Sequence, residues 1–170
     1  TDLFSPKKKK SKGDTAASPV SKENLAIAKS WLASSDEYNL LVNGTAITAF
    51  PVYYQNDLAL LRQSLRIVQA GTEVAEVKGK DLIPAHGLAM SRLLKTSVFP
   101  TEALTYEQAI AYLRKEAIVL PPSVPKGYVL VTYKEIPLGF VKNIGNRANN
   151  LYPQEWRIRS GYLPDDIRTL

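Results

Sequence analysis

Apolar residues along the chain switch between helical and strand-like spacing, and this pattern predicts a mixed α+β protein. From Leu25 onwards they recur every three or four positions, and Ser21 suits the N-cap of such a helix. Residues 38–50 read as two strands joined at Asn43-Gly44, because Asn and Gly tolerate the positive φ of a type I′ turn. The pattern therefore predicts a helix followed by a β-hairpin.

The next stretch of the chain continues the mixture of short elements. Leucines spaced by three and four positions from Leu58 predict a short helix, and residues 66–69 and 73–78 have the composition of strands. Residues 84–95 return to helical spacing with Pro84 near the first turn, a position where proline is tolerated. We therefore expect residues 21–98 to form one small α+β unit.

A second unit is expected after residue 98. The pattern breaks at Phe99-Pro100, and a helix begins near Thr105. Residues 128–133 and 138–144 read as paired strands around a turn. The sequence thus predicts two small units, 21–98 and 99–170, the second consisting of a helix, a loop and a β-rich part.

Charge is distributed unevenly. The 170 residues carry a net charge of +6, and residues 1–30 hold seven lysines or arginines against three acids. Lys7–Lys10 and Lys12 lie among Ser, Gly, Pro and Ala, so residues 1–20 are expected to be a basic flexible linker, which either only tethers or also attracts phosphates.

Composition also limits the class of protein. The chain contains no cysteine and no apolar run near the roughly 18 residues of a membrane span, so a cytoplasmic protein that does not enter the membrane is expected. The start at Thr1, without an apolar signal segment, indicates a fragment or a processed chain.

A segment near the C-terminus combines cations, amides and aromatic rings. Between Gly139 and Arg159 it holds four cations against one acid. Cations neutralise phosphate, Asn side chains bond base edges or the 2′-OH, and exposed rings stack on unpaired bases. The expected RNA contacts are Lys142, Arg147, Arg157 and Arg159 to phosphate, Asn143, Asn146 and Asn150 to polar groups, and Tyr152 or Trp156 to bases. The alternative is structural, because Asn and Gly form turns and these rings can fill the core of a small barrel.

Two groups of residues carry a resemblance to a known family. Leu138-Gly139-Phe140 followed by Lys142, and then Asn150-Leu151-Tyr152-Pro153, resemble the Gly-aromatic-x-Lys and Asn-x-Tyr-Pro signature of a PUA-like RNA-binding domain. The upstream group consists of Gly71, Glu76-Val77-Lys78, Lys80, Pro84-Ala85-His86 and Leu88-Ala89. Together, over roughly residues 25–160, they resemble the C-terminal region of bacterial, RsmF-like members of the Nop/Sun family of S-adenosylmethionine-dependent RNA cytosine-C5 methyltransferases. One departure is Asn149, where many relatives have a lysine, so a phosphate contact from that position is in doubt.

The resemblance implies that this chain belongs to a larger protein in which RNA binding and catalysis are carried by different domains. Residues 21–98 would be an α+β linking domain, and residues 99–170 a PUA-like mixed β-barrel with a flanking helix. The family's catalytic domain is Rossmann-like, binds S-adenosylmethionine and uses a cysteine nucleophile. This chain has no cysteine and no glycine-rich loop between a strand and a helix, so it is expected to be non-catalytic, with S-adenosylmethionine bound elsewhere in the parent protein.

Two other chemical interpretations concern isolated polar residues. His86, the one histidine, could act as a general base with Asp81, but a structural or interdomain contact is the commoner role for a lone histidine. Asp165-Asp166 could form half of a metal site, yet a helix start or a solvated position explains it better, and no metal site is expected. For Tyr53-Tyr54, strand-like alternation predicts one buried and one exposed ring.

Two functions remain open from the sequence. The first is a module that binds structured RNA, with small-subunit ribosomal RNA as the expected partner, and positions it for an upstream methyltransferase domain that it also contacts within the parent protein. The second is a structural module that packs on the catalytic domain through the apolar surface of residues 25–95 and reads no RNA. A hydrolase using His86 with Asp81 ranks below both.

Overall fold

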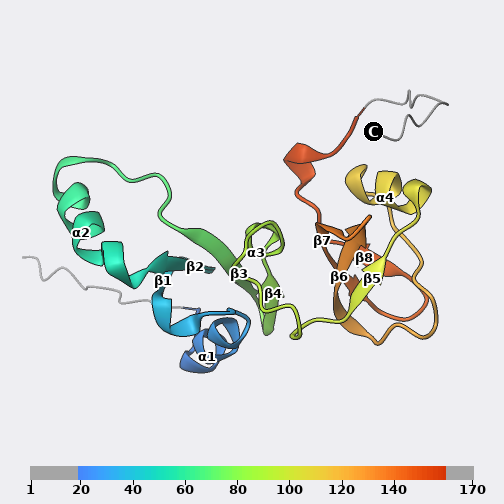
Figure 1. Ribbon diagram of the computed structural model, residues 1–170, viewed down its shortest axis with the longest axis horizontal. Helices are drawn as coiled ribbons and strands as arrows, with labels where there is room; N and C mark the ends of the chain where they lie inside the picture. Colours follow the sequence, from blue (N-terminus) through green and yellow to red (C-terminus); the bar gives the residue numbers. More distant parts are fainter. Residues whose placement is uncertain (1–18, 160–170) are drawn as a thin grey trace, which may run out of the picture.

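The computed structural model describes residues 19–159, which form two four-stranded sheets side by side (Figure 1). The expected basic linker with Lys7–Lys12 and the Asp165-Asp166 pair lie outside the described residues. Within residues 19–159 no helix is long and apolar enough to cross a bilayer.

The N-terminal part begins with helix α1 (Lys22–Ser30), as the apolar spacing predicted. The Ser21 hydroxyl accepts a hydrogen bond from the backbone N–H of Asn24, and the Asn24 side chain accepts one from the backbone N–H of Ser21. This reciprocal capping box satisfies two donors at the helix start. A short 3₁₀ turn, η1 (Ser35–Glu37), then leads into the first sheet.

The expected hairpin is present, but its turn is shifted by one residue. Strands β1 (Tyr38–Asn43) and β2 (Ala46–Pro51) pair with Asn43 opposite Ala46, so Gly44 and Thr45 are the central residues. Gly44 has a φ of 60°, whereas Thr45 has no positive φ. A positive φ at the first central position alone is typical of a type II′ turn, so the type I′ prediction was wrong.

The first sheet is antiparallel throughout, in the order β1-β2-β3-β4. After η2 (Val52–Tyr54) and the predicted helix, α2 (Gln55–Ser64), come strands β3 (Thr72–Lys78) and β4 (Asp81–Pro84). Residues 66–69 are irregular rather than a strand. In Figure 1, α2 lies at the end of the molecule remote from the second sheet.

The helix predicted at residues 84–95 is much shorter. Helix α3 comprises only His86–Ala89. Farther on, the chain pairs with the end of the first helix: Lys95 N–H donates to the Trp31 carbonyl, and the Leu93 carbonyl accepts from Ala33. These long-range hydrogen bonds take the backbone groups that a longer helix would use.

The C-terminal part contains the second sheet, in the order β5-β6-β7-β8. Its elements are β5 (Thr101–Ala103), α4 (Tyr106–Leu113), β6 (Gly127–Tyr133), β7 (Ile136–Asn143), β8 (Ala148–Asn150) and η3 (Gln154–Trp156). Strand β5 is parallel to β6, and the other pairs are antiparallel. Among the described residues the sheet stays open, so the α+β class is confirmed while the expected closed barrel is not seen.

The second sheet is buried on both faces, which explains why its central strands are apolar almost without interruption. Phe140 on β7 and Leu130 on β6 join the core of the first sheet, where Phe140 packs on Phe99 with ring centroids 4.9 Å apart. Their neighbours Val131 and Val141 face the other way, into a core covered by α4. The two parts of the chain therefore share one core and form a contact between sheets.

Candidate nucleic-acid interface

A cluster of cations lies where the two sheets meet. Lys142, near the end of β7, forms an ion pair of 2.7 Å with Asp81, at the start of β4. This hydrogen bond, together with the nearby Tyr128, raises the pKa of Lys142. The pair links the turn of the first sheet to the second sheet.

Four further cations lie on turns and loops that adjoin the strands of this ion pair. Lys78 and Lys80 flank the β3–β4 turn beside Asp81, and the Lys126 stem lies over Gly145, in the turn that leads to Arg147. All four are exposed. We call this the basic surface; its members are Lys78, Lys80, Lys126, Lys142 and Arg147.

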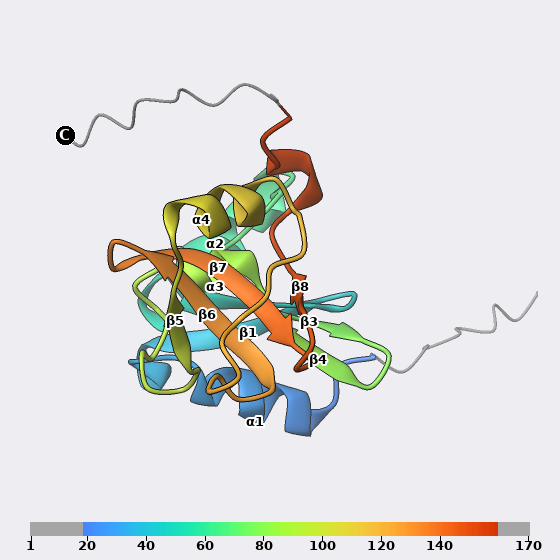
Figure 2. The same ribbon diagram turned by 90° about the vertical axis from the view of Figure 1, so that its right-hand side faces the viewer.

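The other predicted contacts form a separate group. Trp156 ends η3, and Arg157 and Arg159 follow it as exposed residues. This segment is held to the end of α4 by a hydrogen bond from the Ile158 N–H to the Leu113 carbonyl, 2.9 Å long. Because β8 separates it from the β7–β8 turn, the four predicted phosphate contacts lie in two groups rather than one (Figure 2).

Two of the predicted asparagines serve the framework. Asn143 is buried, and its side-chain NH₂ donates to the carbonyls of Val124 and Pro125, each at 3.1 Å. The NH₂ of Asn150 donates to carbonyls at the end of α4, and its oxygen accepts from the Tyr152 N–H. Base readout by these two amides is therefore not supported, because backbone groups already occupy them.

The remaining polar candidate lies on the basic surface. Asn146 is exposed in the β7–β8 turn next to Arg147. Asn149, the position at which many relatives have a lysine, is also exposed and lies directly opposite Lys142 in the pairing of β7 with β8. A lysine there would add a sixth cation to the same surface.

His86 contacts aromatic rings from the C-terminal part of the chain, which is one of the structural roles expected of it. At the start of α3, its ring centroid lies 5.2 Å from that of Tyr152 and 5.3 Å from that of Trp156, both edge-on. Its Nδ1 is buried and has no hydrogen-bond partner among the described residues, and burial lowers the pKa of the imidazole. Asp81 is bound to Lys142 instead, so the general-base pair of His86 with Asp81 does not form.

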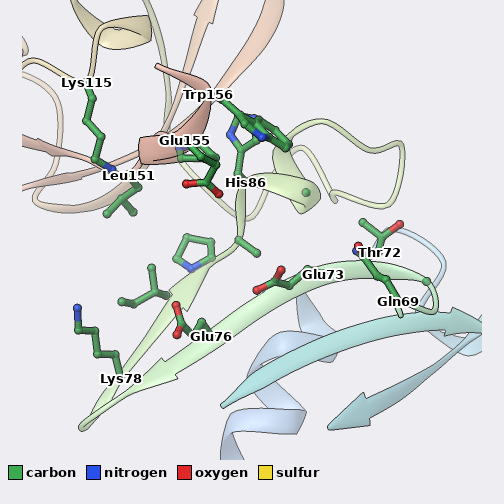
Figure 3. A pocket seen from close by; sticks show the side chains of 16 residues that line it. Gln69, Thr72, Glu73, Glu76, Lys78, His86, Lys115, Leu151, Glu155 and Trp156 are labelled. Carbon is green, nitrogen blue, oxygen red and sulfur yellow. The ribbon is translucent and has the colours of Figure 1, made fainter. Parts of the chain in front are cut away.

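A cleft of about 670 Å³ lies beneath these rings, between β3 and the segment after β8 (Figure 3). Its titratable lining comes from β3, α3, the segment after α4 and η3: Glu73, Glu76, Lys78, His86, Lys115 and Glu155. The carbonyl of the half-buried Tyr152, next to the lining residues Leu151 and Pro153, accepts a hydrogen bond from the Lys115 ammonium. No group of three His, Cys, Asp or Glu within residues 19–159 is arranged to hold a metal ion.

Comparison with known proteins bears on this arrangement. Residues 99–158, which contain the second sheet, match the family described as Methyltransferase RsmF PUA domain. The chain is also 29% identical over 138 residues to Ribosomal RNA small subunit methyltransferase F of Enterobacter sp. (strain 638). That alignment covers 81% of this chain and 27% of the relative. These matches show an RsmF-like C-terminal region. The RsmF-like region thus spans about a quarter of the relative's length.

Several residues of the basic surface and the cleft had no signal in the sequence. Lys126 lies between prolines and a glycine, which indicated only a loop, and Glu73 and Glu155 are 82 positions apart. They meet in one cleft because α3 packs on both β3 and β7 and so holds the two sheets together. Tyr152, Trp156 and His86 each had a signal in the sequence, but nothing in it indicated that the three rings pack together.

The buried imidazole makes the stability of the RsmF-like region depend on pH. The pKa of His86 is lowered on folding, so as pH falls below about 6.5 the unfolded chain takes up the proton first. The contribution of His86 to the free energy of unfolding is fully present above that pH. It is expected to fall by less than about 1 kcal/mol towards pH 5.5, since the half-buried ring is partly screened by solvent. Urea unfolding at pH 7.5 and 5.5 should show this loss, and His86→Gln should remove it; an equal loss in both proteins would contradict the assignment.

Proposed function

We propose that this chain is a non-catalytic RNA-binding region that positions structured RNA for a methyltransferase domain of the same protein. The observation that carries the proposal is the basic surface, to which both sheets contribute. The surface has five cations, and the acid among them is Asp81, which pairs with Lys142, so it attracts a phosphate backbone without depending on sequence. The similarity to an RsmF PUA domain and to a ribosomal RNA methyltransferase supports RNA, and small-subunit ribosomal RNA in particular, as the partner.

The ion pair of Lys142 is compatible with phosphate binding. An ammonium group has three donors, and one of them forms the hydrogen bond of 2.7 Å with Asp81. The Lys142 side chain remains 36% exposed, so its other donors can face a ligand. Asp81 thereby orients Lys142 at the junction of the sheets, where a bound RNA would contact both. Methyl transfer, with S-adenosylmethionine, would belong to the methyltransferase domain.

Salt dependence tests the electrostatic part of this proposal. For the double variant Lys142→Ala, Arg147→Ala, the slope of log affinity against log salt should become shallower by about 1.8 for duplex RNA, or about 1.4 for single strands. The measurement is binding of the full chain to small-subunit ribosomal RNA fragments by fluorescence anisotropy across a salt series. Circular dichroism establishes that the variant is folded.

A control of equal charge separates the basic surface from nonspecific attraction. Lys22→Ala, Lys29→Ala removes two exposed cations from α1 and leaves the basic surface intact. Asn149→Lys, opposite Lys142, should strengthen binding and steepen the salt slope. Equal losses in both double variants would contradict binding at the basic surface and would assign RNA capture to charge elsewhere.

A second candidate function rests on α2 and its flanks. Seven large apolar side chains in residues 52–68 are more than 40% exposed: Val52, Tyr53, Tyr54, Leu60, Leu61, Leu65 and Val68. Both tyrosines are exposed, so the expected burial of one was wrong. We propose that this surface packs on the methyltransferase domain, because the relative that the chain matches is a methyltransferase nearly four times as long as the alignment.

Two charged substitutions distinguish this packing role. Leu60→Glu, Leu65→Glu should leave the melting temperature of the 170-residue chain almost unchanged, because both side chains are exposed at 65% and 58%. In the longer methyltransferase the same pair should lower the melting temperature by several degrees, as measured by calorimetry. A dimer of the short chain that dissociates on substitution would instead assign the surface to self-association.

A further inference from the structure

Three carboxylates converge on the cleft between the sheets. Glu73 and Glu76 point into it from β3, and Glu155 points into it from η3 (Figure 3). Within residues 19–159 none of the three forms an ion pair with a lysine or arginine. Burial, and then the neighbouring charge of Glu76, raise the pKa of Glu73. A ligand that donates hydrogen bonds into the cleft would stabilise the charged form of Glu73 and so act against both effects.

An aromatic surface borders the same cleft. The Trp156 ring is 60% exposed although it packs edge-on against His86. His86 lies beside it in an uncharged state near neutral pH, because burial lowers its pKa. A flat ring laid on the exposed indole would cover apolar area and stack, as unpaired bases do on tryptophan. The cleft therefore offers a stacking surface beside a set of acceptors.

The balance of charge inside the cleft excludes a phosphate as its occupant. Three carboxylates face two lysines, Lys78 and Lys115, and the Lys115 ammonium already donates to the Tyr152 carbonyl. An anion there would meet net repulsion, whereas a neutral ring would not. Arg157, exposed directly after Trp156 and not part of the cleft lining, can hold a phosphate outside the cleft. A nucleotide would then place its base inside and its backbone at the rim.

We propose that this cleft receives one unpaired nucleobase that carries an exocyclic amino group, stacked on Trp156 and donating to Glu73 or Glu155. The proposal rests on the RNA-binding function proposed above and adds to it a site for a single base. The volume of about 670 Å³ is ample for one nucleoside and lies within the range of about 300–1,000 Å³ common for small-molecule sites. Cytosine fits this chemistry and uracil does not, because uracil has a carbonyl where cytosine has the amino group.

A matched pair of single-stranded RNA hexamers, oligo-C and oligo-U, tests the base site in the full chain. Both carry the same phosphates, so the basic surface does not distinguish them. We expect oligo-C to bind about tenfold more tightly and to shift the indole N–H resonance of Trp156 in heteronuclear NMR spectra, with the buried Trp31 as an internal reference. Glu73→Gln, Glu155→Gln should bring the two affinities within about twofold, and Trp156→Ala should weaken both.

The outcomes separate this site from RNA binding as such. Salt-sensitive binding of both hexamers with equal affinity, unaffected by Glu73→Gln, Glu155→Gln, would overturn the base site and leave the RNA function standing. If neither hexamer binds, free cytidine and uridine are added to the protein instead. A shift of the Trp156 indole resonance with cytidine alone supports the base site, and no shift with either overturns it. Spermidine that produces the same shift and displaces cytidine would assign the cleft to a polyamine and overturn the proposal.

Discussion

Gly139→Ala is expected to lower the free energy of unfolding by about 3–5 kcal/mol, a large effect for a single added methyl group. Gly139 has a φ of +143°, which side chains rarely adopt, and strain of this kind costs about 1–3 kcal/mol. A Cβ there would overlap the Tyr112 hydroxyl and come within 2.9 Å of His86 Nδ1. Overpacking of a filled core adds about 1–3 kcal/mol. Urea unfolding of the wild type and the variant measures the sum.

Gly79→Ala provides the matched control. Gly79 also has a positive φ, of 63°, but no atom lies within 4 Å of the site of a Cβ. Its substitution should cost only about 1–2 kcal/mol, from the backbone conformation alone. Similar losses at both glycines would mean that Tyr112 and His86 yield to the methyl group, and would remove the steric argument for glycine in the Gly-aromatic-x-Lys motif.

Phe140→Ala is expected to destabilise the protein by about 3–5 kcal/mol and to weaken the coupling between the two sheets. The side chain is 1% exposed and lies on β7, yet it packs in the core of the first sheet, against Phe99. Its truncation leaves a cavity where the sheets meet. In hydrogen exchange, the amides of β3 and β7 should open with the same free energy in the wild type. In the variant, the opening free energies of the two strands should differ.

Ile136→Ala on the same strand is the control for this prediction. Ile136 is 66% exposed, so the change should cost about 0.5 kcal/mol or less and leave the protection of both sheets alike. If amide protection in Phe140→Ala falls by the same amount in both sheets, Phe140 is not the main apolar link between them. The Lys142–Asp81 ion pair would then be the next contact to remove.

The same residues connect stability with the proposed function. The carbonyl of Phe140 accepts a hydrogen bond of 3.1 Å from the buried Tyr112 hydroxyl, whose pKa is raised by burial. Tyr112 in turn packs on Tyr152, and Tyr152 packs on His86, which lines the cleft. A change at β7 therefore reaches both the basic surface and the cleft. RNA-binding assays of Gly139→Ala and Phe140→Ala consequently need parallel measurements of folding.

Local chemistry was enough to predict the elements whose signals lie within a few residues. The capping residues Ser21 and Thr105 start α1 and α4, as the spacing of apolar residues indicated. The hairpin around Gly44 was placed correctly apart from a shift of its turn. Such elements are formed by contacts three or four positions apart, or across a tight turn, and these contacts are visible in a sequence.

Elements stabilised by distant partners were missed for the opposite reason. The three-residue strands β5 and β8 form because they pair with the edges of β6 and β7. The helix predicted to reach Lys95 stops earlier, because the Lys95 N–H bonds to the Trp31 carbonyl instead. The sequence alone determined an α+β chain with a cationic, amide-rich C-terminal segment and a resemblance to a PUA domain. The tertiary structure decided which of those side chains serve the framework and which face solvent: Asn143 and Asn150 bond backbone carbonyls, whereas Lys142 pairs with Asp81 across the junction of the sheets and Arg147 is exposed. The physical reason is that a side chain's partner is set by what folding brings beside it, and spacing along the chain carries no information about contacts between sheets.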